Sequence, residues 1–362
     1  MKVAFRELHR LLNELDTLHE TFSTYREDLN SAHPVGLLYL ARSVVHDLAE
    51  APLDVRTEIL IHTDAARNYS VQNLAELFAD GFEVPLISPA GTDRLVDGEM
   101  PIVLGVPAFD PYNAFLAPIL AHEVAHLATD ISLLALLEEQ LGQVPSTALL
   151  SDEVDSRGVR SANARLWRWL EEILCDSLAA WATGPSWLFA LAAFLPVPSS
   201  AADEHHPSAN VRTAWAWRAL KRWGWEDFMR AKFPEFVEFV SGIALEDAPD
   251  DDSPLNDRLW KSFDAVMKVV ESSEAPRLDP TEYEATEKQH GLQVSFERSY
   301  MPPGLAADPP GAWTLLLAAW VACAENSGIE YVARTVANQP YNQFLIKSFE
   351  LSGIARIWRT LP

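Results

Sequence analysis

Cysteine, basic residues and long apolar runs are scarce in this 362-residue chain. The two cysteines, Cys175 and Cys323, are too few for a disulfide framework and are typical of a reducing compartment. The longest apolar runs, Trp187–Leu195 and Leu315–Ala324, fall well short of the ~20 residues that span a bilayer. The first residues carry spaced charges without the apolar segment of a secretory signal. We therefore expect a cytoplasmic protein with no membrane partner.

Basic residues are few relative to acidic ones. The chain has 28 basic against 52 acidic residues and a formal net charge of -24. Such a chain repels nucleic-acid backbones and anionic membranes, so we expect no nucleic-acid partner. Hydrophobic residues make up 48% of the sequence, enough to bury a core in one large or two modest domains.

The opening segment has the pattern of a long helix. Apolar residues between Leu8 and Leu29 recur every three or four positions, which is typical of a heptad seam. We expect this seam to pack within its own domain, with helix-mediated self-association through residues 8–29 as the alternative. A second helix is expected over Val35–Leu48.

Short β-rich segments follow the second helix. They lie at Thr57–Thr63, Phe82–Ser88 and Pro101–Phe109, and each is bounded by Asp, Gly or Pro. We expect them to form a small sheet. The Asp-Pro step at 110–111 fits the cap and first position of a helix, which Pro118 should then kink.

The rest of the chain is mostly helical in pattern. Helical segments are expected near residues 133–141, 162–182, 211–223, 225–240, 259–270, 313–324 and 342–358. The acidic, proline-containing segment Glu246–Asp257 is the best linker candidate. The predicted fold class is α+β and predominantly α-helical. The predicted divisions are an N-terminal helical segment (1–50), a core (51–245), an acidic linker (246–257) and a helical C-terminal region (258–362).

One motif in this pattern carries chemistry. The stretch PILAHEVAHLATD, Pro118–Asp130, has two histidines four residues apart with a glutamate after the first. On a helix, His122 and His126 lie on one face and can turn their imidazoles to one point. Two neutral imidazoles suit a zinc ion with an open position, and Glu123 could take a proton from a zinc-bound water. This is the H-E-x-x-H pattern; the alternative is a pair of hydrogen-bonded histidines in a buried helix.

A catalytic zinc needs a third protein ligand. The extended pattern with a third histidine fails, because Thr129 and Ser132 stand where glycine and that histidine are expected. The later helical stretch offers Glu172 to bind the metal and Asp176, four residues on, to hydrogen-bond a ligand histidine. Glu171 is the competing ligand; Glu172 is preferred because it alone pairs with Asp176 at helical spacing.

The order of H-E-x-x-H on one helix and E-x-x-x-D on the next resembles the gluzincin metallopeptidases over roughly Pro101–Arg212. The resemblance implies a zincin-like core in residues 51–245, with a small sheet before the H-E-x-x-H helix and Zn²⁺ as the cofactor. It also implies a peptide or protein substrate, aligned along the sheet edge near Pro101–Phe109.

The segment DEHHPSANVR, Asp203–Arg212, adds a third element. His206 and Arg212 match the H-P-x-x-x-x-R step of several gluzincin families, in which a histidine and an arginine reach the site. A histidine there could donate a hydrogen bond to the oxyanion of the tetrahedral intermediate. The alternative is that His205 and His206 are surface loop residues.

Together the motifs predict a zinc metallopeptidase, a hydrolase that cleaves peptide bonds through a zinc-activated water. Its predicted residues are Glu123 as general base, His122, His126 and Glu172 as metal ligands, Asp176 behind a ligand histidine, and His206 with Arg212 at the oxyanion. Two alternatives share the motifs. One is a metal-stabilised pseudo-peptidase or interaction scaffold, and the other is a non-peptidase zinc hydrolase.

Overall fold

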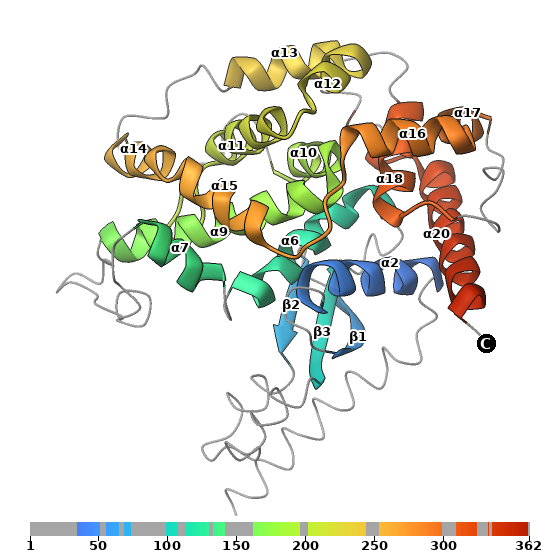
Figure 1. Cartoon of the computed structure of the whole chain (residues 1–362), viewed down its shortest axis with the longest axis horizontal. Helices are drawn as coiled ribbons and strands as arrows, with labels where there is room; N and C mark the ends of the chain where they lie inside the picture. Colours follow the sequence, from blue (N-terminus) through green and yellow to red (C-terminus); the bar gives the residue numbers. More distant parts are fainter. Residues whose placement is uncertain are drawn as a thin grey trace, which may run out of the picture. The chain divides into compact units, whose positions relative to one another are not determined.

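The structure is a computed structural model in which helices dominate and the described strands form one small sheet (Figure 1). The predicted mainly helical class with a small sheet is confirmed. The predicted helix over Leu8–Leu29 and the predicted strand over Phe82–Ser88 lie outside the described residues. The structure describes residues 35–50, 56–64, 69–73, 99–107, 113–129, 133–141, 162–195, 202–243, 253–298, 309–323, 332 and 335–360.

The chain divides into two compact units. Within the described ranges, one unit holds the three strands and the other holds the helices, including α2 (Val35–Val45) and the π-helical turn η1 (His46–Glu50). These limits differ from the domain boundaries predicted from the sequence. The last residues of the predicted linker, Ser253–Asp257, lie in helix α14 (Ser253–Lys261).

The sheet has the strand order β1-β3-β2. Strand β1 (Arg56–Asp64) runs parallel to β3 (Glu99–Pro107), and β2 (Ser70–Asn73) runs antiparallel to it. The central strand β3 buries side chains on both faces from Ile102 to Val106, as the near-continuous apolar run of a central strand requires.

Two of the predicted strands, Thr57–Thr63 and Pro101–Phe109, correspond to β1 and β3. Nothing in the sequence predicts β2, because its four residues SVQN carry no period-two apolar pattern. The expectation of a free sheet edge near Pro101–Phe109 is wrong over residues 102–105. There β3 is hydrogen-bonded to β1 on one side and to β2 on the other, which leaves no backbone groups for an added strand.

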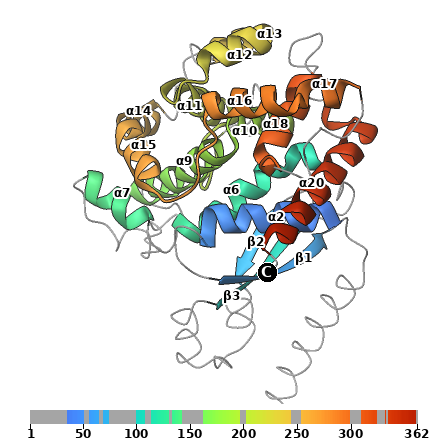
Figure 2. The same cartoon turned by 45° about the vertical axis from the view of Figure 1, so that its right-hand side comes forward.

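Four helices carry or surround the motif residues. Helix α9 packs against α6, α10 and α11, and α10 also packs against α6 and α11 (Figure 1 and Figure 2). Their bounds are α6 (Ala117–Ala128), α9 (Ala162–Thr183), α10 (Pro185–Phe194) and α11 (Ala209–Arg222). Six fully buried tryptophans fill the unit's interior: Trp169, Trp187, Trp215, Trp217, Trp225 and Trp320.

The helix that carries the histidines begins later than predicted. The 3₁₀ turn η2 (Ala114–Leu116) precedes it, and Pro118 lies in the first turn of α6. The predicted start at 110–111 and the predicted kink at Pro118 are therefore wrong. Proline is favoured in a first turn, because its missing N–H would have no intrahelical partner there.

The remaining helices complete the helical unit. The predicted helix over 225–240 is divided at Phe233–Pro234, where proline starts a new helix. Within the described ranges, no helix is both long and apolar enough to cross a membrane. These helices are α7 (Leu134–Leu141), α12 (Glu226–Lys232), α13 (Pro234–Ile243), α15 (Phe263–Ser272), α16 (Pro280–His290), α17 (Leu292–Glu297), α18 (Ala312–Cys323) and α20 (Gln339–Thr360).

The junction between α9 and α10 depends on a glycine. Gly184 has φ 59°, and a Cβ atom built there would lie 3.0 Å from Trp225 Cζ2 and 3.1 Å from Leu278 Cδ2. We expect Gly184→Ala to lower the free energy of unfolding by about 1–3 kcal/mol, from backbone strain and crowding together. Urea unfolding followed by circular dichroism measures this change.

Gly242 in α13 provides the matched control, because a Cβ atom there meets nothing within 4 Å. Gly242→Ala should leave stability unchanged or raise it by about 0.5–1 kcal/mol, as helix propensity predicts. Equal effects of the two substitutions would contradict the strained conformation at Gly184.

Candidate metal centre

The two motif histidines occupy one face of α6, as their spacing predicts. The rings of His122 and His126 have centroids 5.0 Å apart and are perpendicular. Contacts between α6 and α9 are extensive, and this face of α6 meets the side chain of Glu172 on α9. Two segments distant in sequence are thus brought together at the imidazoles.

The carboxylate of Glu172 lies opposite both rings. Its Oε2 atom is 3.4 Å from His122 Nε2, and its Oε1 atom is 3.6 Å from His126 Nε2. One donor atom from each of the three residues lies within 4.8 Å of the other two, so the group could hold a metal ion. Glu172 Oε2 is buried and accepts no hydrogen bond. A cation among these atoms would offset the desolvation cost of that buried, unpaired oxygen.

Each ring also has a carboxylate at its other nitrogen, Nδ1, and a different residue supplies it for each histidine. His122 Nδ1 lies 2.9 Å from Asp176 Oδ1, in a close contact that is out of line for a hydrogen bond, and His126 Nδ1 lies 3.1 Å from Glu171 Oε1. A carboxylate at Nδ1 favours the tautomer with its proton on that atom, which leaves the lone pair on Nε2 for a metal. Asp176 therefore contacts a motif histidine, as expected, but the hydrogen bond predicted between them is not formed.

Glu171 has a part that the sequence reasoning missed. It was expected only as a competing ligand, whereas its carboxylate contacts His126 Nδ1. The signal was present in the adjacent acids Glu171 and Glu172, since each can reach a different atom of a facing helix. Which atom each reaches depends on the rotation of α9 about its axis, and a single helix does not specify that rotation.

A buried ion pair between Arg212 and Asp176 lies next to the candidate metal ligands. Arg212 Nε and Nη2 donate to the two carboxylate oxygens of Asp176 at 2.8 and 2.6 Å. Arg212 Nη1 also lies 3.7 Å from Glu172 Oε2. Both members of the pair are buried. We infer that Arg212 holds Asp176 in place, because two of its N–H groups form this bidentate pair. The role of Arg212 at the oxyanion stays a prediction.

The proton affinities of the centre follow from burial and from these neighbours. Burial alone would lower the pKa of His122, yet its contacts with Asp176 and Glu172 raise that pKa to about 10. Burial opposes the ionised form of Glu172, but His122, Arg212 and His126 hold the pKa of Glu172 well below its usual range. Burial raises the pKa of Glu123 above that of an ordinary glutamate, which suits a group that accepts a proton.

His206 reaches the centre from an exposed loop. Asp203 Oδ1 accepts the backbone N–H groups of His205 and His206 at 2.7 and 2.6 Å, and His206 Nδ1 lies 3.2 Å from both Asp203 oxygens. His206 Nε2 lies 3.7 Å from Glu172 Oε1. The side chain is 49% exposed. His206 therefore lies in an exposed loop, as the surface-loop alternative predicts. Its ring also faces the metal centre, as the oxyanion role requires.

The three histidines share one arrangement. His122, His126 and His206 each direct Nδ1 at a carboxylate and Nε2 at Glu172. Trp187 in α10 adds a stacked contact with the His122 ring, with centroids 5.5 Å apart and planes 5° apart. No sequence signal marks Trp187, because it lies in an apolar run that reads as helix core.

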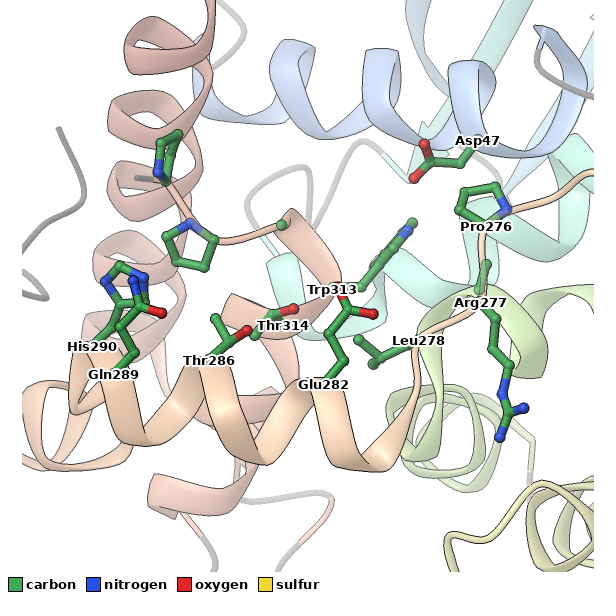
Figure 3. A pocket seen from close by; sticks show the side chains of 14 residues that line it. Asp47, Pro276, Arg277, Leu278, Glu282, Thr286, Gln289, His290, Trp313 and Thr314 are labelled. Atoms are coloured by element: carbon green, nitrogen blue, oxygen red, sulfur yellow. The ribbon is translucent and has the colours of Figure 1, made fainter. Parts of the chain in front are cut away.

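A cavity of about 350 Å³ lies elsewhere in the helical unit (Figure 3). The carboxylates of Asp47 and Glu282 enter it from opposite sides, with Trp313 between them. No member of the candidate metal group lines it. Its wall includes Ala182, ten residues beyond Glu172 on α9 and so ~15 Å further along the helix. The cavity is separate from the metal centre.

No family model, curated protein or solved structure matches the chain. The likeness to gluzincins therefore depends on the spacing of the motif residues and on the way their side chains meet. That geometry can be tested directly by metal binding.

The two adjacent acids should differ in their effect on zinc affinity. Glu172→Gln should lower it by more than the roughly 10- to 100-fold loss expected for Glu171→Gln, because Glu171 acts through His126. Competition with a chromophoric zinc chelator measures both. Glu139→Gln, at an exposed position on α7, is the control and should bind zinc as the unmodified protein does. An equal or reversed order for Glu171 and Glu172 would show that the ligand has been misassigned.

Proposed function

We propose that the chain is a cytoplasmic zinc metallopeptidase of the gluzincin type. The observation that carries the proposal is the convergence of His122 Nε2 and His126 Nε2 on Glu172, whose Oε2 is buried without a hydrogen bond. Two imidazoles and one carboxylate are the protein ligands of a common class of catalytic zinc sites. Two free cysteines, one of them buried, support a reducing location.

The chain's own side chains divide the remaining work. Bound zinc lowers the pKa of a water molecule and polarises the carbonyl of a peptide bond. Glu123, next to His122 on α6, takes up a proton and returns it to the leaving amine. In its imidazolium form, with Nδ1–H held by Asp203, His206 also has a proton on Nε2 and can donate it in a hydrogen bond to the substrate oxygen as negative charge develops there. Asp176 and Glu171 keep the ligand rings oriented.

The openness of the centre favours a peptidase over a metal-stabilised scaffold. Structural zinc sites are usually closed by four protein ligands, whereas within the described ranges the candidate group has three. His206 is half-exposed beside them, which leaves one side of the centre accessible. A non-peptidase zinc hydrolase would use the same residues, and no specific contact of this chain favours it.

Glu123→Gln separates proton transfer from metal binding. The variant should bind one zinc per chain and lose nearly all peptide hydrolysis, because the amide cannot accept the proton. Zinc content is measured by atomic absorption, and hydrolysis by mass spectrometry of a peptide library with and without chelator. His122→Ala should lose both zinc and hydrolysis. A Glu123→Gln protein without zinc would show that Glu123 is a ligand.

His206→Ala tests the oxyanion role. Its loss should lower kcat by roughly 10²- to 10³-fold, as for other oxyanion donors, with little change in KM or zinc content. Glu204→Ala, an exposed neighbour in the same loop, is the control and should keep the kcat of the unmodified protein. An undiminished kcat in His206→Ala would return His206 to the class of surface loop residues.

A further inference from the structure

Arg168 lies beside the metal centre, and the described residues offer its guanidinium no acidic partner. It lies on α9 one turn before Glu171 and Glu172, so it shares their helix face. Its Nη1 lies 2.8 Å from Nδ1 and 3.2 Å from Nε2 of His205. Throughout the described part of the chain, no carboxylate lies within ion-pair distance of Arg168. By contrast, Arg212 and Arg222 each pair with acids.

This lack of a partner is unusual in so acidic a chain. The net charge is -24, so carboxylates are abundant and a half-buried arginine would ordinarily meet one. A guanidinium has five N–H donors in a planar fork, and His205 engages one nitrogen of that fork. The other donors remain for an anionic group that the described residues do not supply.

The position of Arg168 is tied to that of the metal centre. His206 lies 3.7 Å from Glu172, its ring centroid is 6.1 Å from that of His205, and His205 contacts Arg168. The loop is fixed to α9 a second time, because the Asp203 carbonyl accepts hydrogen bonds from Arg165 Nε and Trp169 Nε1, both at 3.1 Å. Arg168 is thus a direct i, i+4 neighbour of Glu172 on α9, with the loop of His205 and His206 beside both residues.

We propose that Arg168 binds a carboxylate group of the peptide substrate. The inference rests on the proposed peptidase function and adds a substrate class to it. The guanidinium fork matches a carboxylate in a bidentate hydrogen-bonded pair. An extended residue spans about 3.3 Å and helix neighbours four residues apart are separated by roughly 6 Å, so the carboxylate would lie about one to three residues from the cleaved bond. The carboxylate belongs to the substrate's C-terminus or to an Asp or Glu side chain near the cleavage site.

Three peptide libraries distinguish the two sources. All are N-acetylated hexapeptides with randomised positions free of Asp and Glu. The first ends in a free carboxylate, the second in a carboxamide, and the third in a carboxamide with one Glu at a fixed internal position. The zinc-loaded full chain should cleave the first or the third roughly 10- to 100-fold faster than the second, the gain expected from a charge-assisted pair. Mass spectrometry should place the cuts within three residues of the carboxylate.

Arg168→Gln tests whether this arginine is responsible. It should remove the preference and leave the rate on the second library unchanged, which a merely structural role of Arg168 would not do. Arg230→Gln, which removes the same charge from an exposed site on α12, is the control and should keep the preference.

Each outcome decides one of the two proposals. A preference for the first library assigns the C-terminus, and one for the third assigns an acidic side chain. Equal cleavage of all three libraries, or a preference that persists in Arg168→Gln, would overturn the carboxylate site and leave the peptidase intact. No zinc-dependent cleavage of any library by a folded, zinc-loaded chain would overturn the peptidase and the carboxylate site with it.

Discussion

A fully buried carboxylate, that of Asp176, sets the geometry of the whole centre. An unpaired buried charge costs several kcal/mol even after relaxation, so its partners must be held in place. Arg212 supplies two hydrogen bonds from α11, and His122 supplies a contact at 2.9 Å from α6. Because Asp176 itself belongs to α9, this one side chain fixes the approach of three helices. The position of Glu172 one turn earlier on α9 follows from the same constraint.

From the ion pair of Asp176 and Arg212, acidic and basic side chains alternate toward the surface. Glu171, Glu172 and Asp176 place three carboxylates within six residues of α9, and the facing elements place histidines and Arg212 opposite them. The raised pKa of His122 and the lowered pKa of Glu172 express one fact, namely that the carboxylates of this centre exceed the fixed positive charge. A proton on His122 offsets that excess, and a divalent cation among the same atoms would offset it more fully, which is the physical reason that these residues suit a metal.

Local spacing predicted much of the centre, and long-range packing supplied the rest. Residues His122 and His126, and likewise Glu172 and Asp176, are four apart on single helices, so periodicity alone places each pair on one face. The contacts of Asp176 with Arg212 and of Glu171 with His126 join positions 36 and 45 residues apart. Those contacts depend on how α9 is rotated against α6 and α11, which periodicity does not specify. Apolar periodicity also fails for the four-residue strand β2 and the polar helix α16. Neither was predicted, because neither has an apolar pattern of its own.

The centre is closed on one side and open on the other, and this asymmetry bears on what it can do. Along α9 the side chains pass from half-buried Arg168, through Glu172 at 12% exposure, to Asp176 at 0%. Trp187 and Arg212 seal the buried end, while the loop with Asp203 and His206 borders the open end. A metal held only for stability has no use for an accessible side, whereas a reacting peptide must enter there. The donors that border this open side, His206 and Arg168, are also those whose hydrogen-bonding capacity the described residues leave partly unused, so the open side is the one that can bind a ligand.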